Sequence, residues 1–245
     1  MYSYRATLGP ADLAFTDRRG GVSAAPFDSL DLALEGDDDP AARAENLRRV
    51  LADFGPGDEL VDLRQVHGAD VVVAEAGEAG SRSVPGRPEA DAVVTARPGI
   101  TLMVRAADCV PVLLVDPAAA VVAAVHSGRQ GLLAGVVPAA VARMREIGAT
   151  GPITAWVGPH VCGACYEVPA GMQAEVGRAV PAAVATTSWG TPALDLGAGV
   201  REQLLASGVE VVDAARCTRE SPDLYSYRRD GARAGRHAGL VRIRR

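Results

Sequence analysis

The sequence contains no lysine, because all 25 of its Lys-or-Arg positions are arginine. Schiff-base enzymes, pyridoxal phosphate enzymes and phosphate-loop nucleotide hydrolases need a lysine, so these classes are excluded. Aromatic residues are also scarce, at 4% of the 245 residues, whereas hydrophobic residues make up 48%. The core must therefore be built mainly from valine, leucine and alanine.

Three further absences limit the partners and the location of the protein. The net charge is −5 and no run of arginines exceeds two residues, so a basic stripe for nucleic acid is not expected. The longest apolar stretch, residues 110–125, is interrupted by Pro111, Asp116 and Pro117, which argues against a membrane span. The first residues lack a signal-peptide pattern. We expect a cytoplasmic monomer whose four cysteines stay reduced.

Hydrophobic periodicity and turn residues predict alternating helices and strands. Asp39 and Pro40 are suited to open a helix that Gly55 would end. Strands are predicted at residues 60–66, 71–74, 92–95, 101–106, 110–115, 121–125, 153–157, 209–212, 225–228 and 240–243. Further helices are predicted at residues 132–147, after Pro169 and at residues 200–207, with a surface loop at residues 77–89. No repeat or linker is visible, so we expect one α+β domain with mixed sheets over residues 1–245.

Three candidate metal ligands lie at predicted strand ends. His67 follows the strand at 60–66, His126 follows the strand at 121–125, and Cys109 lies between two strands. Strand ends meet at one edge of a sheet, so these side chains can converge. Two imidazoles and a thiolate leave a fourth position for water, which is the composition of a catalytic zinc site. Such a water ionises near neutral pH.

The same residues allow a metal-free interpretation. Cys109 and His126 could form a nucleophile–base pair, and Asp108 could orient the base. The glycine-rich turn after His126 precedes a predicted helix, whose free backbone amides could attract an anion beside Arg129. The residues alone do not separate the zinc centre from the nucleophile pair.

The remaining cysteines and histidines are assigned no catalytic role. Cys162 and Cys165 form a single C-x-x-C, whereas a zinc ribbon needs two such pairs. No thioredoxin-like context accompanies them either, so we interpret them as small apolar residues in a tight loop on the substrate side. His160 and His237 have no predicted partner.

Several spaced motifs occur in a recognisable order along nearly the whole chain. They are Arg18-Arg19-Gly20-Gly21-Val22-Ser23, Gln65-Val66-His67-Gly68, Ala107-Asp108-Cys109-Val110-Pro111, Val125-His126-Ser127-Gly128, Gly158-Pro159 with Tyr166-Glu167-Val168, and Cys217-Thr218 with Tyr225-Ser226-Tyr227-Arg228-Arg229 and Gly235-Arg236. With these motifs the sequence resembles the multicopper polyphenol oxidase (laccase-domain) family, also called the peptidoglycan editing factor or purine nucleoside phosphorylase family.

The resemblance implies an α/β sandwich of mixed sheets. It places the family's metal ligands on His67, Cys109 and His126, with zinc as the expected metal and copper as the alternative. It implies phosphate-dependent cleavage of adenosine, inosine or methylthioadenosine, adenosine deamination, and a role of some members in editing peptidoglycan precursors. The expected partners are therefore a small nucleoside and phosphate.

One motif departs from the family pattern. The family continues after its third-motif histidine with Ala-Gly-Trp-Arg-Gly, whereas this chain has Ser127-Gly128-Arg129-Gln130-Gly131. Gln130 has no positive charge with which to hold an anion. Arg129, Arg228 and Arg236 are therefore the candidate substrate contacts, and phosphate use is the point that needs testing.

With the resemblance in view, three alternatives to a zinc phosphorylase remain. A copper-dependent phenol oxidase needs a cluster of further histidines, and the chain has only four in all. A metal-free Cys–His amidase acting on peptidoglycan precursors would depend on the thiol and resist chelators. A non-enzymatic assembly partner in cell-wall or division machinery would bind proteins without turnover.

Overall fold

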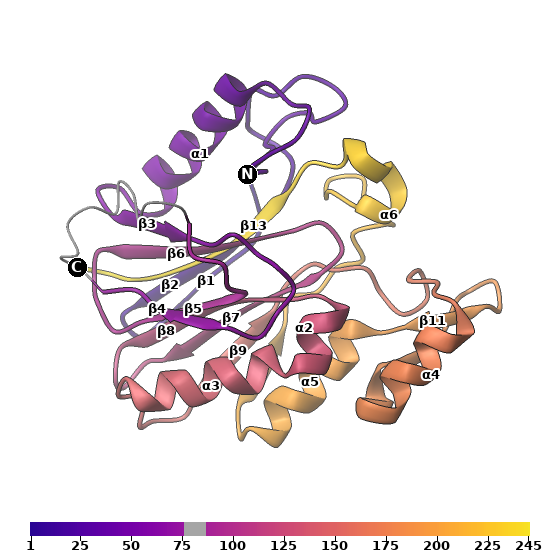
Figure 1. The fold of residues 1–245 in the computed structure, drawn as a ribbon. Coiled ribbons are helices and arrows are strands. Elements are labelled where there is room, and N and C mark those ends of the chain that lie inside the picture. Colours follow the sequence, from indigo (N-terminus) through magenta and orange to yellow (C-terminus); the bar gives the residue numbers. More distant parts are fainter. Residues whose placement is uncertain (76–86) are drawn as a thin grey trace.

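The computed structural model describes residues 1–75 and 87–245, and two mixed β-sheets form its centre (Figure 1). The five-stranded sheet has the order β1 (Tyr2–Leu8), β2 (Ala11–Thr16), β13 (His237–Ile243), β6 (Ile100–Ala106) and β3 (Glu59–Asp62). The six-stranded sheet has the order β12 (Glu210–Asp213), β9 (Thr154–Val157), β7 (Val110–Asp116), β8 (Val121–Ser127), β5 (Ala92–Thr95) and β4 (Val71–Val73). Most neighbours are antiparallel, but β3–β6, β4–β5 and β9–β12 are parallel.

Alternating side chains of the central strands fill two different cores. In β7, Leu113 and Val115 pack with β2, β6 and β13 between the two sheets. Val112 and Leu114 point to the other face and pack with helices. Side chains alternate across a strand, so a strand that is apolar at every position is buried on both faces. This explains why β6, β7 and β8 are buried throughout.

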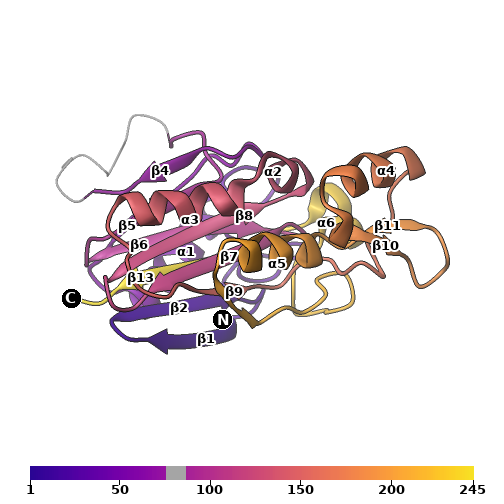
Figure 2. The same cartoon turned by 90° about the horizontal axis from the view of Figure 1, so that it is seen from below.

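Helices cover the outer face of each sheet. The six-stranded sheet packs against α2 (Arg129–Ala134), α3 (Val136–Glu146) and α5 (Leu196–Ala206), and Figure 2 shows α3 and α5 lying over it. The five-stranded sheet packs against α1 (Pro40–Phe54) through Val50 and Phe54. The predicted α/β sandwich of mixed sheets flanked by helices is therefore confirmed.

The smaller elements extend from one end of the sandwich (Figure 1). They are α4 (Ala170–Ala179), the two-stranded sheet of β10 (Val184–Thr186) and β11 (Pro192–Leu194), the short helix α6 (Tyr227–Asp230), and the 3-10 turns η1 (Pro181–Ala183) and η2 (Gly231–Arg233). Within the described residues, no helix has both the length and the apolar character that crossing a membrane requires.

Most predicted elements are present, and the helix at 40–54 begins and ends as expected. Asp39 accepts a hydrogen bond from the amide of Ala41 at 2.9 Å, and Gly55 follows the last helical residue. The predicted loop at residues 77–89 lies mostly outside the described residues. The short strands of the β10–β11 pair were not predicted.

Four predicted elements are wrong in type or extent. The helix predicted at 132–147 is two helices, because Gly135 adopts a left-handed conformation with φ 78° between them. The strand predicted at 225–228 is the start of α6, because Ser226 caps the amide of Arg229. The strand predicted at 60–66 ends at Asp62, and α5 begins at Leu196 rather than at residue 200.

Candidate active site

A cavity of about 810 Å³ opens near one end of the two sheets. Its volume is within the range of small-molecule sites. The cavity is lined from the five-stranded sheet by Arg105 and Ala106, from the six-stranded sheet by His126, and from the α6 region by Tyr227 and Arg228. The site thus draws on segments that are far apart in the sequence.

The structure brings His67, Cys109 and His126 together at this cavity, and we call these three residues the His/Cys centre. One ligand atom from each lies within 4.8 Å of the others, and the Cys109 sulfur is 3.7 Å from Nε2 of His67. The two imidazole rings lie edge to face, with centroids 4.9 Å apart. His67 is exposed, Cys109 is partly buried and His126 is buried, so the centre has an open side.

The local positions differ from those predicted. His126 does not follow its strand but lies inside β8, opposite Pro111 of β7. His67 lies in a loop after β3, with a positive φ of 62° that is uncommon for a residue with a side chain. The strand-end argument therefore identified the neighbourhood but not the backbone setting of either histidine.

Asp91 organises the His/Cys centre. One carboxylate oxygen is 2.8 Å from Nδ1 of His126, and the other accepts hydrogen bonds from the amides of Val66 and Gly68 on either side of His67. Burial acts to raise the pKa of Asp91, but the hydrogen bonds from His126 and Gly68 outweigh it and lower the pKa. Asp91 is fully buried, so this charged group positions both histidines.

Sequence reasoning missed Asp91. A single acidic residue stands between Ala90 and Ala92 at the start of a buried apolar strand, and that was the available signal. A buried carboxylate needs partners, because an unpaired charge in the interior is costly. Its partners only became visible once the fold placed β5 beside β8.

Gly128 leaves the space that the His/Cys centre needs. A Cβ atom at this position would lie 2.5 Å from Cδ2 of His67 and 3.2 Å from the sulfur of Cys109. Real Cβ atoms do not approach other heavy atoms as closely as the first of these contacts. The glycine of the third motif is therefore required by close approach and not by a special backbone angle.

Cys109 and His126 favour each other's charged form. Burial acts against both charges, but the attraction between thiolate and imidazolium lowers the pKa of Cys109 and raises the pKa of His126. The Asp91 carboxylate adds to the effect on His126. A thiolate is the form in which cysteine ligates a metal or attacks as a nucleophile.

Asp108 is at the cavity, but both of its carboxylate oxygens are engaged. One accepts a hydrogen bond from the hydroxyl of Thr218 at 2.5 Å, and the other accepts from the amide of Arg228 at 2.6 Å. Its backbone has a φ of 91°. These contacts attach the C-terminal loop to the β6–β7 turn that carries Cys109.

The predicted arginine contacts separate into two groups. Arg228 and Arg236 line the cavity, whereas Arg129 is not among its lining residues. Arg228 lies over the ring of Tyr166 at 4.5 Å and donates to the carbonyl of Glu167. The turn after His126 therefore does not bring its arginine to the cavity.

Arg105 is a cavity residue that sequence reasoning missed. Its guanidinium donates to the carbonyl of Leu32 and, at 2.6 Å, to the carboxylate of Asp62. Among the described residues, its Nη1 atom is buried and has no hydrogen-bond partner. Buried polar atoms without a partner are rare in folded proteins, so this donor marks Arg105 as a residue with a possible role beyond packing.

The other two histidines lie away from the His/Cys centre. His160 is buried and its Nδ1 is 2.8 Å from the carbonyl of Gly158. His237 is fully buried on β13, and burial lowers its pKa to about 4. Neither lines the cavity, so no further histidine accompanies Cys109 there.

The fold and the site together define an α/β sandwich protein with a cysteine and two histidines at one cavity. The sequence profile of the family described as multi-copper polyphenol oxidoreductase laccase matches residues 12–244, so the chain belongs to this family. The family predicted from the motifs is thereby confirmed.

Relatives of similar sequence and solved structures agree with this assignment. The chain is 52% identical to a purine nucleoside phosphorylase of Streptomyces coelicolor over 98% of this chain and 99% of the relative. It is 43% identical to a purine nucleoside phosphorylase of Corynebacterium glutamicum over 95% and 94% of the two chains. The crystal structure of YlmD from Geobacillus stearothermophilus has a TM-score of 0.87 at 31% identity, covering 96% of this chain and 93% of the other. Relatives of this name indicate that the chain is an enzyme.

Proposed function

We propose that this protein is a zinc-dependent purine nucleoside phosphorylase whose metal is held by His67, Cys109 and His126. The observation that carries the proposal is the convergence of these three side chains at a cavity that arginines also line. Relatives named purine nucleoside phosphorylase support the reaction class.

The His/Cys centre fits a zinc ion by its donor set and spacing. Zinc–sulfur and zinc–nitrogen bonds in a tetrahedral site place the two donor atoms about 3.6 Å apart, and Cys109 Sγ and His67 Nε2 are 3.7 Å apart. Asp91 holds the Nδ1 side of His126, as carboxylates commonly do behind metal-bound histidines. Zinc bound there would act as a Lewis acid toward a substrate oxygen.

The arginines supply an anion site. Arg105 has a buried Nη1 without a partner, and Arg228 and Arg236 line the same cavity. Guanidinium groups match phosphate geometry and stay charged. These three side chains can therefore hold phosphate although Gln130 replaces the arginine of the family pattern.

The remaining walls suit a nucleoside. Tyr166 and Tyr227 supply aromatic surface, and Leu34, Leu63 and Leu196 supply apolar surface. Aromatic rings offer flat faces on which a purine can stack. Asp108, with both oxygens engaged, would fix the loop of Arg228 rather than donate a proton to the leaving base.

The proposal includes the wider activities that the family resemblance implies. Inosine and methylthioadenosine are candidate substrates, adenosine deamination is a candidate second reaction, and peptidoglycan precursor editing is a candidate role. We assign residues 1–245 to one functional unit, because the cavity draws on both sheets. Free thiols suit a reducing compartment, so we propose a cytoplasmic location. A monomer remains a separate expectation.

The decisive experiment incubates the zinc-loaded protein with adenosine, with and without phosphate, and separates the products by chromatography. Adenine that appears only with phosphate is the expected result. Cys109→Ala is the matched inactive variant. Inosine alone would replace phosphorolysis by deamination, and absence of any product in the presence of bound zinc would contradict adenosine as the substrate.

A second candidate function has one specific observation in its favour. The arrangement matches the catalytic groups of a thiol hydrolase, in which a carboxylate orients a base that activates a thiol nucleophile. Here Asp91 would orient His126, and His126 would activate Cys109. A metal-free amidase on peptidoglycan precursors would then be the activity. Thiol alkylation that abolishes turnover, together with full activity in a chelator, would favour this function over the zinc phosphorylase.

A further inference from the structure

A second group of metal-ligating side chains lies outside the cavity. Cys162, Cys165, Cys217 and Glu220 each place a ligand atom within 4.8 Å of the others. We call these four residues the cysteine cluster. In the described part of the chain, only this cluster and the His/Cys centre bring three or more such groups together. None of its four residues lines the cavity.

Two short turns of equal spacing build the cysteine cluster. In the first, the amides of Cys165 and Tyr166 both donate to the carbonyl of Cys162 at 3.0 Å. In the second, the amide of Ser221 donates to the carbonyl of Cys217 at 3.0 Å. The pattern is therefore C-x-x-C followed by C-x-x-E, and short spacings of this kind are usual in structural zinc sites.

Backbone pairing holds the two turns side by side. His160 and Cys217 form a parallel bridge, in which the His160 amide donates to Arg216 and the Thr218 amide donates to His160. Cys165 and Glu220 are 55 positions apart in the sequence, yet the Cys165 thiol is 3.4 Å from a Glu220 carboxylate oxygen. The cluster is therefore preformed by the fold around it.

We propose that the cysteine cluster is a structural zinc site with four protein ligands. Sulfurs bound to one tetrahedral zinc lie about 3.8 Å apart, which is compatible with the observed spacing. Thiolates favour zinc, copper(I) or iron–sulfur clusters, and a carboxylate as fourth ligand favours zinc among these. Arg219 donates to the carbonyl of Cys165 and so lies beside the negative charge of three thiolates and a carboxylate.

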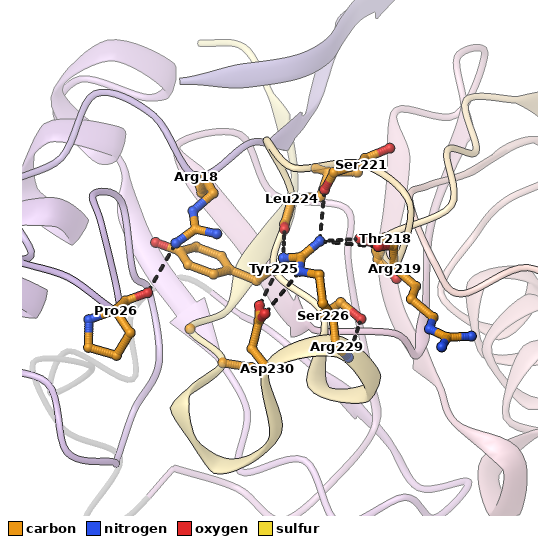
Figure 3. Close-up of polar contacts among 12 residues, drawn as sticks. Arg18, Pro26, Thr218, Arg219, Ser221, Leu224, Tyr225, Ser226, Arg229 and Asp230 are labelled. Atoms are coloured by element: carbon orange, nitrogen blue, oxygen red, sulfur yellow. Dashed lines mark hydrogen bonds and ion pairs between the residues drawn. The ribbon is translucent and has the colours of Figure 1, made fainter. Parts of the chain in front are cut away.

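The site would hold two walls of the cavity in place. Tyr166, which follows Cys165, lines the cavity, and Thr218, which follows Cys217, binds Asp108. Arg229 donates to the carbonyls of Thr218 and Ser221 at 3.0 Å and of Leu224 at 2.7 Å (Figure 3). A metal clip between distant segments stabilises most when the loop that it closes is long.

Metal counting tests this inference independently of the proposed reaction. The protein is purified with zinc under reducing conditions and its zinc content is measured by mass spectrometry. We expect two zinc ions per chain in the natural protein, one in Cys109→Ala, one in Cys217→Ser and none in the double variant. Equal zinc content in Cys217→Ser and the natural protein would overturn the cluster. Equal content in Cys109→Ala would instead overturn the His/Cys centre.

A milder variant guards against loss of folding. Glu220 is exposed, so Glu220→Gln should fold and yet bind zinc at least about tenfold more weakly in competition with a chelator. Glu202→Gln, which changes an exposed glutamate on α5, is the matched control. Equal affinity in both variants would overturn the four-ligand site.

Discussion

The His/Cys centre and the cysteine cluster use similar side chains in opposite ways. The His/Cys centre offers three donors beside a cavity and has an exposed side at His67. The cysteine cluster offers four donors from two adjoining turns and contributes nothing to the cavity lining. Three protein ligands leave room for substrate, whereas four close the metal off. On this difference in number and placement of donors rests our proposal that the His/Cys centre is reactive and the cysteine cluster structural.

The two sites are also supported differently. A buried carboxylate, Asp91, fixes both histidines of the His/Cys centre from behind. The cysteine cluster is supported by backbone pairing and by Arg229, which binds the carbonyls around it. Changes at the first site should act on turnover, and changes at the second should act on stability.

Cys109→Ala gives the largest expected difference between the sites. Loss of an outer-shell partner already weakens metal sites or activity by about 10–100-fold, so loss of a ligand should lower phosphorolysis by more than about 100-fold. Cys217→Ser should lower turnover far less but reduce the thermal midpoint by several degrees. Steady-state rates and thermal unfolding of both variants check this contrast. A lower turnover in Cys217→Ser than in Cys109→Ala would contradict this assignment of roles.

Asp91→Asn should have the next largest effect. The amide keeps the shape of the side chain but can no longer accept from His126 as a carboxylate does, so zinc affinity at the His/Cys centre should fall about 10–100-fold. Asp116→Asn is the control, because Asp116 is equally buried and caps the amides of Ala118, Ala119 and Gly151 away from the cavity. Chelator competition measures both. A similar affinity in the two variants would contradict the role of Asp91.

Local signals in the sequence indicated mixed sheets and the three residues of the His/Cys centre, and the family resemblance added the sandwich. Apolar runs mark β6, β7 and β8, and the motif residues next to them are unusual in such runs. The same reasoning placed residues 225–228 in a strand. Tyrosines favour strands, but Ser226 caps a short helix there.

The missed features depend on contacts between distant segments. Asp91 meets residues 66 and 68 on one side and His126 on the other. Arg105 meets Asp62, and the C-x-x-C meets Cys217 and Glu220 only through the pairing of two loops. A single sequence without the fold contains no signal for such pairs. Cys162 and Cys165 were therefore interpreted as apolar filling, and that interpretation stays untested until zinc is counted.

Gly128→Ala sharpens the comparison by changing space without changing a ligand. The added methyl group would overlap the ring of His67, so the loop must move away from Cys109. Overpacking of this kind costs about 1–3 kcal/mol, which would lower zinc affinity at the His/Cys centre about tenfold or more. The cysteine cluster should keep its zinc.

The control for this change is Gly171→Ala. A Cβ atom at Gly171 on α4 meets nothing within 4 Å. This variant should retain both metals and gain slight stability, since alanine favours a helix by about 1 kcal/mol over glycine. Loss of zinc from both glycine variants alike would show that the His67 contact is not the cause.

Arg228→Met has the smallest expected effect and tests which arginine reaches the anion. Arg228 lines the cavity but is exposed, so its charge is partly screened and the KM for phosphate should rise only about three- to tenfold. Its backbone amide, which binds Asp108, is unchanged by the substitution. Arg129→Met removes an equal charge outside the cavity lining and should leave this KM unchanged. A larger rise in Arg129→Met would mean that phosphate binds beside the start of α2, where the free backbone amides of the turn would form the anion site. The departure from the family motif would then have moved the phosphate-binding arginine by one position and kept its function.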